Sequence, residues 1–296
     1  MPFAVITFDF DPLIPFAGVA VRWETVGTAG AILLALLAAA ILARRAPSHA
    51  DGRRLHLDDL LSIAIAAVPG AIVGGRLGYA LIHLDYFSSH LSALLDPGQG
   101  GFELALGVAG GILTAAYLAR VIEAPVGRWA HVAAVPLLLA IEGGKAAMAW
   151  GGSGQGTLHV AEWTTRYAGS GPWGSLGPEL PAHPSQLYEG DIALGIAALL
   201  TAAVASGAFG RRDGRLLLVA LAAWLVGRAA IATTWRDSAV LGPLSADQVL
   251  SLALAGVCLG TLVYLWVRRP RPAEHGPVPE WPDPAVTESW RSSPGR

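Results

Sequence analysis

Long unbroken runs of apolar residues, separated by polar segments, divide this chain. A run of about 18 to 23 apolar residues has the length at which an α-helix crosses the hydrocarbon core of a bilayer. Each such run predicts a helix, because backbone groups in lipid must be hydrogen-bonded internally. The pattern predicts an all-α integral membrane protein with seven transmembrane helices. The predicted spans are 25–43, 60–82, 103–122, 129–150, 189–206, 215–234 and 246–267.

Composition supports this class and narrows the chemistry. Of the 296 residues 53% are hydrophobic and 14% charged, whereas a soluble domain carries about 25% charged residues. The single cysteine, Cys258, lies inside an apolar run, so no intramolecular disulfide is expected and no thiol chemistry is indicated. The N-terminal segment has no basic region and no small-residue cleavage site, so it does not resemble a removable signal peptide.

Arginine residues are concentrated in alternate loops, which predicts the orientation of the chain. By the positive-inside rule the arginine-rich loops are cytoplasmic, so the N-terminus is expected outside and the C-terminus in the cytoplasm. The opposite loops hold only Arg22, Arg166 and Arg236. The arginine-rich set is Arg44, Arg45, Arg53, Arg54, Arg120, Arg128, Arg211, Arg212, Arg215, Arg268, Arg269 and Arg271.

The runs also predict the domain organisation. Residues 1–267 form the predicted seven-span membrane domain, and residues 268–296, rich in proline and without apolar periodicity, predict a disordered cytoplasmic tail. The polar loop at 151–188 is too long for a simple connection and is expected to be a functional cap on the outer side. Glycines spaced four apart, as in Gly74 and Gly78, Gly107 and Gly111, and Gly256 and Gly260, permit close helix contacts.

Three spans carry a cation in their outer halves: Arg76, Lys145 and Arg228. Ionisable residues inside a membrane span are costly and usually mark function. We expect the three to line an outward-facing cavity for an anion, and arginine binds a phosphate through paired donors. The alternative is that they reach the interface or neutralise nearby carboxylates, namely Glu103, Glu142, Glu189 and Asp191. Glu142, for example, is three residues before Lys145 on the same helix face and could pair with it.

The string HPSQLYEG, residues 183–190, is expected to form a polar wall of that cavity. Gln186 and Tyr188 would offer donors to ester or glycerol oxygens, and Glu189 would orient an arginine or His183. The alternative is that Ser185, Gln186 and Glu189 only cap the helix that follows. That alternative does not account for the histidine and the tyrosine.

Three strings, GGRLGYALIHLDYF, HPSQLYEG and LSADQVLSLALAG, resemble signature stretches of the bacterial prolipoprotein diacylglyceryl transferases. The resemblance runs from about Phe8 to Tyr264. It implies transfer of the diacylglyceryl group of phosphatidylglycerol to the lipobox cysteine of a prolipoprotein, releasing glycerol phosphate, with no metal and no cofactor. It also implies a multi-pass protein of the bacterial plasma membrane. The implied partners are phosphatidylglycerol or another anionic phospholipid and preprolipoprotein signal peptides, but no nucleic acid.

Several of the family's signature residues are replaced here. A histidine of span three, the family's favoured base, is replaced by Ala109, and a glutamate of span six by Ala232. The changes leave two interpretations open: a divergent transferase with a different base, or a catalytically inactive relative that binds or moves anionic phospholipid. In span four Lys145 replaces an arginine, Met148 and Gly151 replace asparagines and Ser153 replaces a glutamate, while Glu24 replaces an early tyrosine.

The retained residues give the candidate site. We expect His183 and Arg228 to be catalytic, with Glu24 and Glu142 as further candidate bases. The expected substrate-binding residues are Lys145, Arg76, Gln186, Tyr188 and Glu189.

Two other functional classes were considered from the sequence. The string GGSG at 151–154 has the form found in intramembrane serine proteases, but spans six and seven contain no histidine to act as its base. A proton-coupled carrier would need a chain of intramembrane acids, which the spans do not show. Both classes are disfavoured.

Overall fold

The apolar runs form long helices in the computed structural model, which describes residues 5–47, 54–96, 98, 100–169 and 171–268. Within these ranges, seven helical segments are long and apolar enough to cross a membrane, at bounds close to the predicted ones, which confirms the predicted helical class. The predicted disordered tail lies outside the described residues except for Arg268. The long helices are α1 (Trp23–Arg45), α2 (Leu57–Ile82), α4 (Leu104–Val121), α5 (Val126–Gly151), α6 (Ser185–Ala205), α7 (Arg215–Ile231) and α8 (Ala246–Val267).

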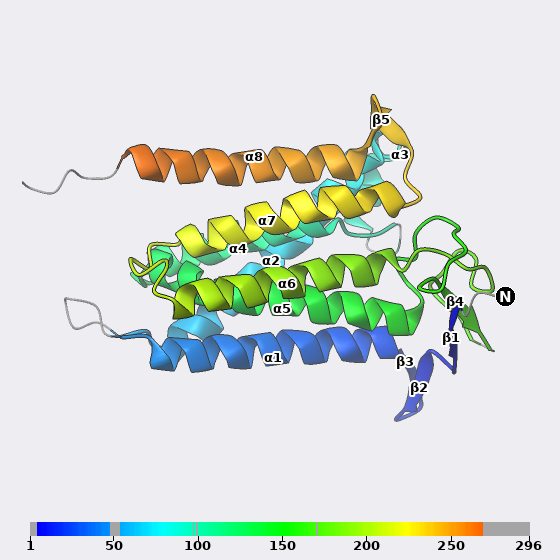
Figure 1. The fold of residues 1–296 in the computed structure, drawn as a ribbon, viewed down its shortest axis with the longest axis horizontal. Helices are drawn as coiled ribbons and strands as arrows, with labels where there is room; N and C mark the ends of the chain where they lie inside the picture. Colours follow the sequence, from blue (N-terminus) through cyan, green and yellow to red (C-terminus); the bar gives the residue numbers. More distant parts are fainter. Residues whose placement is uncertain (1–4, 48–53, 97, 99, 170, 269–296) are drawn as a thin grey trace, which may run out of the picture. The chain divides into compact units, whose positions relative to one another are not determined.

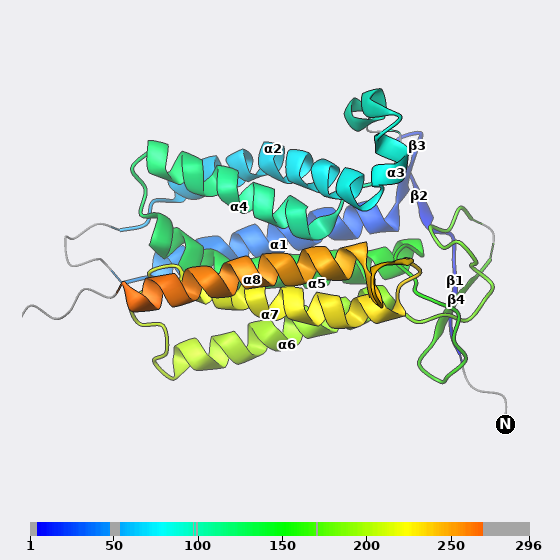
Figure 2. The same cartoon turned by 90° about the horizontal axis from the view of Figure 1, so that it is seen from above.

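Residues 1–262 form one unit, and the chain divides after Leu262. Within this unit α5 is central, because it packs against α1, α6 and α7, while α2 packs mainly against α4 (Figures 1 and 2). The main core lies where α5, α6 and α7 meet, around Leu138 and Trp224, which are both fully buried. Large apolar side chains such as Leu113 and Leu199 point outward instead. A helix that is apolar on all sides is typical of a membrane span.

Glycines bring the backbones of α2 and α4 into direct contact. A Cβ atom added to Gly74 would lie 2.2 Å from the carbonyl oxygen of Leu106, and one added to Gly110 would lie 2.2 Å from that of Gly70. Both distances are shorter than any allowed contact, so only glycine fits at this crossing. The glycine pairs predicted in spans two and three therefore lie at a close helix contact. The pair Gly256 and Gly260 does not, because no atom lies within 4 Å of an added Cβ at either position.

We expect Gly74→Ala to lower the free energy of unfolding by about 1–3 kcal/mol, the usual cost of overpacking. The matched control is Gly30→Ala in α1, where an added Cβ meets nothing within 4 Å. Thermal unfolding of both variants in detergent measures the difference. Equal unfolding temperatures for the two variants would contradict the close α2–α4 contact.

Short strands and turns form a cap at one end of the helices (Figure 1). Strand β1 (Ile6–Asp9) pairs in parallel with β4 (Thr165–Ala168), so the N-terminal segment joins the long loop after α5. The pairing is reinforced by Phe8, whose ring stacks on that of Tyr167 at 5.2 Å. The remaining short elements are the hairpin of β2 (Leu13–Phe16) and β3 (Val19–Arg22), the hairpin of β5 (Ala239–Leu241) and β6 (Leu244–Ser245), the short helix α3 (Leu84–Phe87), and the 3-10 turns η1 (Leu91–Leu95) and η2 (Ala232–Thr234).

Candidate functional site

Five charged side chains, one from each of five helix segments, meet beneath the cap; we call them the ionic cluster. Arg228 is at its centre: Nη1 donates to both carboxylate oxygens of Glu189, at 2.8 and 3.0 Å. Its Nη2 donates to Glu103 Oε1 at 3.0 Å and to Asp247 Oδ1 at 3.2 Å. Lys145 Nζ lies 2.7 Å from Glu189 Oε2. The ionic cluster is Glu103 at the start of α4, Lys145 on α5, Glu189 on α6, Arg228 on α7 and Asp247 on α8.

The local structure fixes these carboxylates before any ligand arrives. Glu103 is the N-cap of α4, where its side chain accepts hydrogen bonds from the backbone N–H groups of Ala105 and Leu106 at 2.7 and 2.6 Å. Glu189 follows Pro184 by little more than one turn of α6 and is fully buried. Buried charges must be paired to be tolerated. The ion pair of Lys145 is therefore made across helices with Glu189, and not along its own helix with Glu142.

Aromatic rings and unpaired polar atoms complete this site. The guanidinium carbon of Arg228 lies 4.6 Å from the centre of the Trp235 ring, and Lys145 Nζ lies 5.9 Å from it. Among the described residues, Arg228 Nε and Gln186 Oε1 are buried without a hydrogen-bond partner. Such atoms are costly in a closed protein interior, and they are where a ligand's polar groups can bind.

The predicted cations do not all meet at one place. Lys145 and Arg228 do, as expected from their depth. Arg76 has a different set of partners: its Nε donates to Leu94 O at 2.9 Å, and its terminal nitrogens donate to the carbonyl oxygens of Ala93, Asp96 and Gly101. Arg76 thus fixes η1 and the segment after it to the end of α2.

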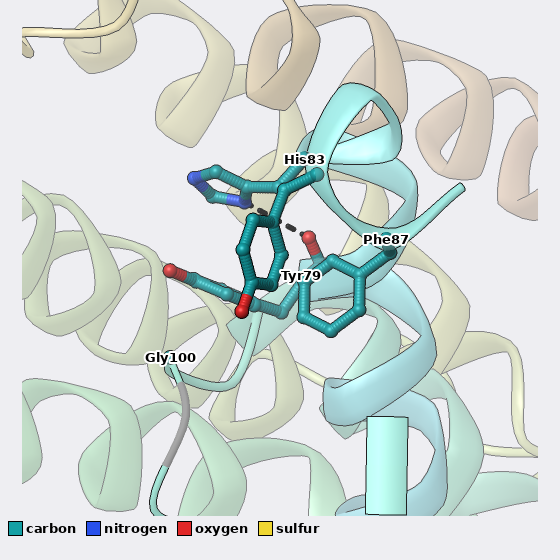
Figure 3. A pocket seen from close by; sticks show the side chains of 5 residues that line it. Tyr79, His83, Phe87 and Gly100 are labelled. Carbon is teal, nitrogen blue, oxygen red and sulfur yellow. Dashed lines mark hydrogen bonds between the residues drawn. The ribbon is translucent and has the colours of Figure 1, made fainter. Parts of the chain in front are cut away.

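Beside Arg76 lies an aromatic pocket of about 370 Å³ (Figure 3). Tyr79, His83, Phe87 and Gly100 line it together with Tyr86, and the rings of Tyr79 and His83 stack at 4.1 Å. His83 Nδ1 is 2.9 Å from the carbonyl oxygen of Tyr79 (dashed line in Figure 3). Arg76 reaches this region through its guanidinium, 5.4 Å from the Phe87 ring.

His183, the predicted base, lies at the junction between the cap and α6. Its Nδ1 is 3.3 Å from Tyr188 Oη, and its ring stacks on His159 at 4.2 Å. Burial, with a smaller effect of His159, lowers the pKa of His183 below its usual value. The ring is therefore neutral at neutral pH and can accept a proton. One turn further along the chain, Gln186 Nε2 donates to Tyr167 Oη at 3.2 Å, which joins α6 to the cap.

Two of the replaced signature positions contact each other. Ser153 Oγ donates to Glu24 Oε2 at 2.7 Å, and a Cβ added to Gly151 would lie 2.4 Å from the same oxygen. The chain therefore has a carboxylate–hydroxyl pair joining the start of α1 to the segment after α5. The two residues are 129 positions apart, so nothing in the sequence indicated the contact. The partner of the serine in GGSG is thus a glutamate.

Sequence reasoning missed one member of the ionic cluster, Asp247, and considered Glu103 only as a carboxylate that the cations could neutralise. Each lies at the beginning of an apolar run, where a carboxylate ordinarily interacts with the helix N-terminus. An available signal was their position at the same end of the helices as Arg228.

Comparison with known proteins gives the family. A sequence model described as prolipoprotein diacylglyceryl transferase matches residues 12–266. Three similar proteins are named phosphatidylglycerol–prolipoprotein diacylglyceryl transferase. That of Nostoc sp. is 29% identical over 92% of this chain and 95% of its own length. That of Acaryochloris marina is 29% identical over 89% and 93%, and that of Clostridioides difficile 26% identical over 72% and 79%. Since the match covers most of the chain, this protein belongs to the prolipoprotein diacylglyceryl transferase family.

Proposed function

We propose that this chain transfers the diacylglyceryl group of phosphatidylglycerol to the lipobox cysteine of a prolipoprotein. The family membership and the names of the relatives support this reaction. The structural observation that carries it is a pair of cations near one tryptophan ring, the partly buried Lys145 and the buried Arg228, with the Nε donor of Arg228 still unpaired.

The reaction requires a good leaving group. The cysteine sulfur forms a bond to the glycerol carbon that carries the phosphate, and the bond from that carbon to the phosphate oxygen breaks. Its electron pair leaves with glycerol phosphate, so negative charge develops on the phosphate. Cations in a buried site stabilise such charge far better than water does. Arg228 Nε is assigned to a phosphate oxygen, and Lys145 adds charge at the same depth.

The polar residues of α6 are assigned to the rest of the headgroup. Gln186 Oε1 is buried and unpaired, which suits a hydroxyl donor of the headgroup glycerol. Tyr188 and His183 stand together at the start of α6, where the cysteine and the headgroup would arrive, and His183 is the base predicted from sequence. Glu189 holds both cations in position, and Arg76 holds the segment that borders the aromatic pocket.

The orientation is part of the proposal. The arginine-rich helix ends are assigned to the cytoplasmic face of a bacterial plasma membrane, and the cap with the ionic cluster to the outer face. Arg44 and Arg45 are in the last turn of α1, and Arg128 in the first turn of α5 donates to Pro47 O at 2.8 Å. These residues therefore cluster at one end, opposite β1 and β4 (Figure 2).

A second candidate is an inactive relative that binds or moves anionic phospholipid. The observation that favours it is that both terminal nitrogens of Arg228 are taken by carboxylates. Together with the loss of the family's histidine at Ala109, this would leave binding without turnover.

The test uses the purified chain in mixed micelles of detergent and phosphatidylglycerol, with a lipobox peptide as acceptor. We expect release of glycerol phosphate together with a peptide whose mass has increased by one diacylglyceryl group. A peptide with serine in place of the lipobox cysteine is the control and should give neither product. Binding of phosphatidylglycerol without any release would select the second candidate.

A further inference from the structure

The ionic cluster contains one carboxylate more than its cations can neutralise. Lys145 and Arg228 supply two positive charges, and Glu103, Glu189 and Asp247 supply three negative ones. An uncompensated charge in a buried site is costly. One added proton would balance the charges of the cluster, and the three carboxylates compete for such a proton as a coupled set.

The hydrogen bonds show which carboxylate is held least firmly. Glu189 contacts both cations, at 2.7 and 2.8 Å, and Glu103 accepts two backbone N–H bonds in addition to Arg228. The cluster contact of Asp247 is a single one to Arg228 at 3.2 Å, the longest of the set. Its side chain is 12% exposed, against 3% for Glu103 and none for Glu189. Protonation of Asp247 thus disturbs the fewest contacts, and it is the most accessible of the three.

We propose that Asp247 is the catalytic base that accepts the proton of the incoming cysteine thiol, an inference that rests on the proposed transferase function. The S–H bond breaks, the proton moves to a carboxylate oxygen of Asp247, and the sulfur electron pair forms the S–C bond to glycerol. The C–O bond to the phosphate breaks, and its electrons leave with glycerol phosphate. The proton then passes from Asp247 to glycerol phosphate or to water, so the reaction needs no further reactant.

The charges around Asp247 suit this role. Arg228 of α7 contacts Asp247 directly, and Glu103 at the start of α4 contacts the same guanidinium. Asp237, in the loop after η2, adds a negative charge near Asp247. Lys145 and Glu189 lie behind Arg228. Burial and two neighbouring carboxylates favour the protonated form of Asp247, and the ion pair with Arg228 favours its ionised form. A catalytic base must be deprotonated before the reaction and must accept a proton during it, and these opposing effects on Asp247 permit both.

The test compares two acceptor peptides, one with the lipobox cysteine and one with selenocysteine at that position. A selenol is ionised at neutral pH and needs no base, whereas a thiol does. For Asp247→Asn we expect kcat/KM to fall about 10²- to 10⁴-fold with the cysteine peptide, the usual contribution of a general base. With the selenocysteine peptide we expect a loss of only a few-fold.

Controls separate the base from a merely structural group. Glu123→Gln removes an exposed carboxylate just after α4, at the opposite end of that helix from the ionic cluster, and should leave the ratio of the two peptides unchanged. Asp247→Glu should recover part of the activity with cysteine. In the unmodified enzyme, the rate with cysteine should rise with pH through the titration of the base, and the rate with selenocysteine should not. If the asparagine variant fails to fold, the pH profile of Asp247→Glu with the cysteine peptide decides the question. The changed carboxylate should shift that profile if Asp247 is the base and leave it unchanged if another group is the base.

Three results would overturn the inference. Equal losses with both peptides would make Asp247 a positioning residue for Arg228. Unchanged activity of Asp247→Asn in an active enzyme would exclude it from the reaction while leaving the transferase function intact. A loss confined to the cysteine peptide in His183→Ala, but not in Asp247→Asn, would assign the base to His183. Absence of glycerol phosphate release by the unmodified chain would instead remove the proposed function, and this inference with it.

Discussion

Replacing Arg228 with glutamine is expected to abolish diacylglyceryl transfer and to lower the free energy of unfolding by about 3–5 kcal/mol. The side chain is 4% exposed and bonds three carboxylates from three other helix segments. Without it, Glu103 and Asp247 lose their cation, and Glu189 retains only Lys145. The leaving phosphate also loses the Nε donor and the positive charge of Arg228, so we expect kcat/KM to fall at least about 10³-fold.

Thermal unfolding in detergent and glycerol phosphate release together measure this prediction. Arg228→Lys should keep part of the stability but little activity, because an ammonium cannot span three carboxylates as the planar guanidinium does. Arg166→Gln is the matched control, since Arg166 is exposed and its Nε bonds Thr7 in the cap. If Arg228→Gln unfolds at the same temperature as the control and still releases glycerol phosphate, both the ionic cluster and the assigned role of Arg228 are refuted.

The second large effect is expected at Glu189. Glu189→Gln leaves Lys145 buried beside a neutral amide and removes the doubly bonded partner of Arg228, so we expect a loss of about 3–5 kcal/mol in the free energy of unfolding. Activity should fall as well, because both cations are held in place by this one carboxylate.

A double variant shows whether the loss comes from the unpaired lysine. In Lys145→Met with Glu189→Gln, the unpaired charge is gone while Arg228 keeps Glu103 and Asp247. We expect the double variant to unfold at a higher temperature than Glu189→Gln alone and to stay inactive. Additive losses for the two substitutions would show that Lys145 and Glu189 are not coupled.

The helices could be predicted from the sequence because span length is a property of each run by itself. The length and apolar composition of the stretch 246–267 are enough to predict a helix there, and α8 has those bounds. The cap could not be predicted in the same way. Strand β1 has only four residues and pairs with residues more than 150 positions later, so no local pattern identifies it.

The sequence could predict how far along their spans the charged residues of the candidate site lie, but not which groups they pair with. Lys145 and Arg228 were expected at one level because both lie toward the same end of the predicted spans, and they share Glu189. Arg76 lies at a similar place in its span, but its donors bind the backbone carbonyl oxygens of a loop, which a sequence does not display. Asp247 was overlooked because an acidic residue at the start of a helix is ordinary.

The parallel pairing of β1 with β4 has a consequence for how the protein is made. A ribosome delivers residues 6–9 before α1, yet their partner, residues 165–168, follows only after α1, α2, α4 and α5 have been synthesised. The nascent chain therefore carries an unpaired strand edge while four helices are being inserted. Residues 6–9 are therefore made before these four helices but can pair with β4 only after them.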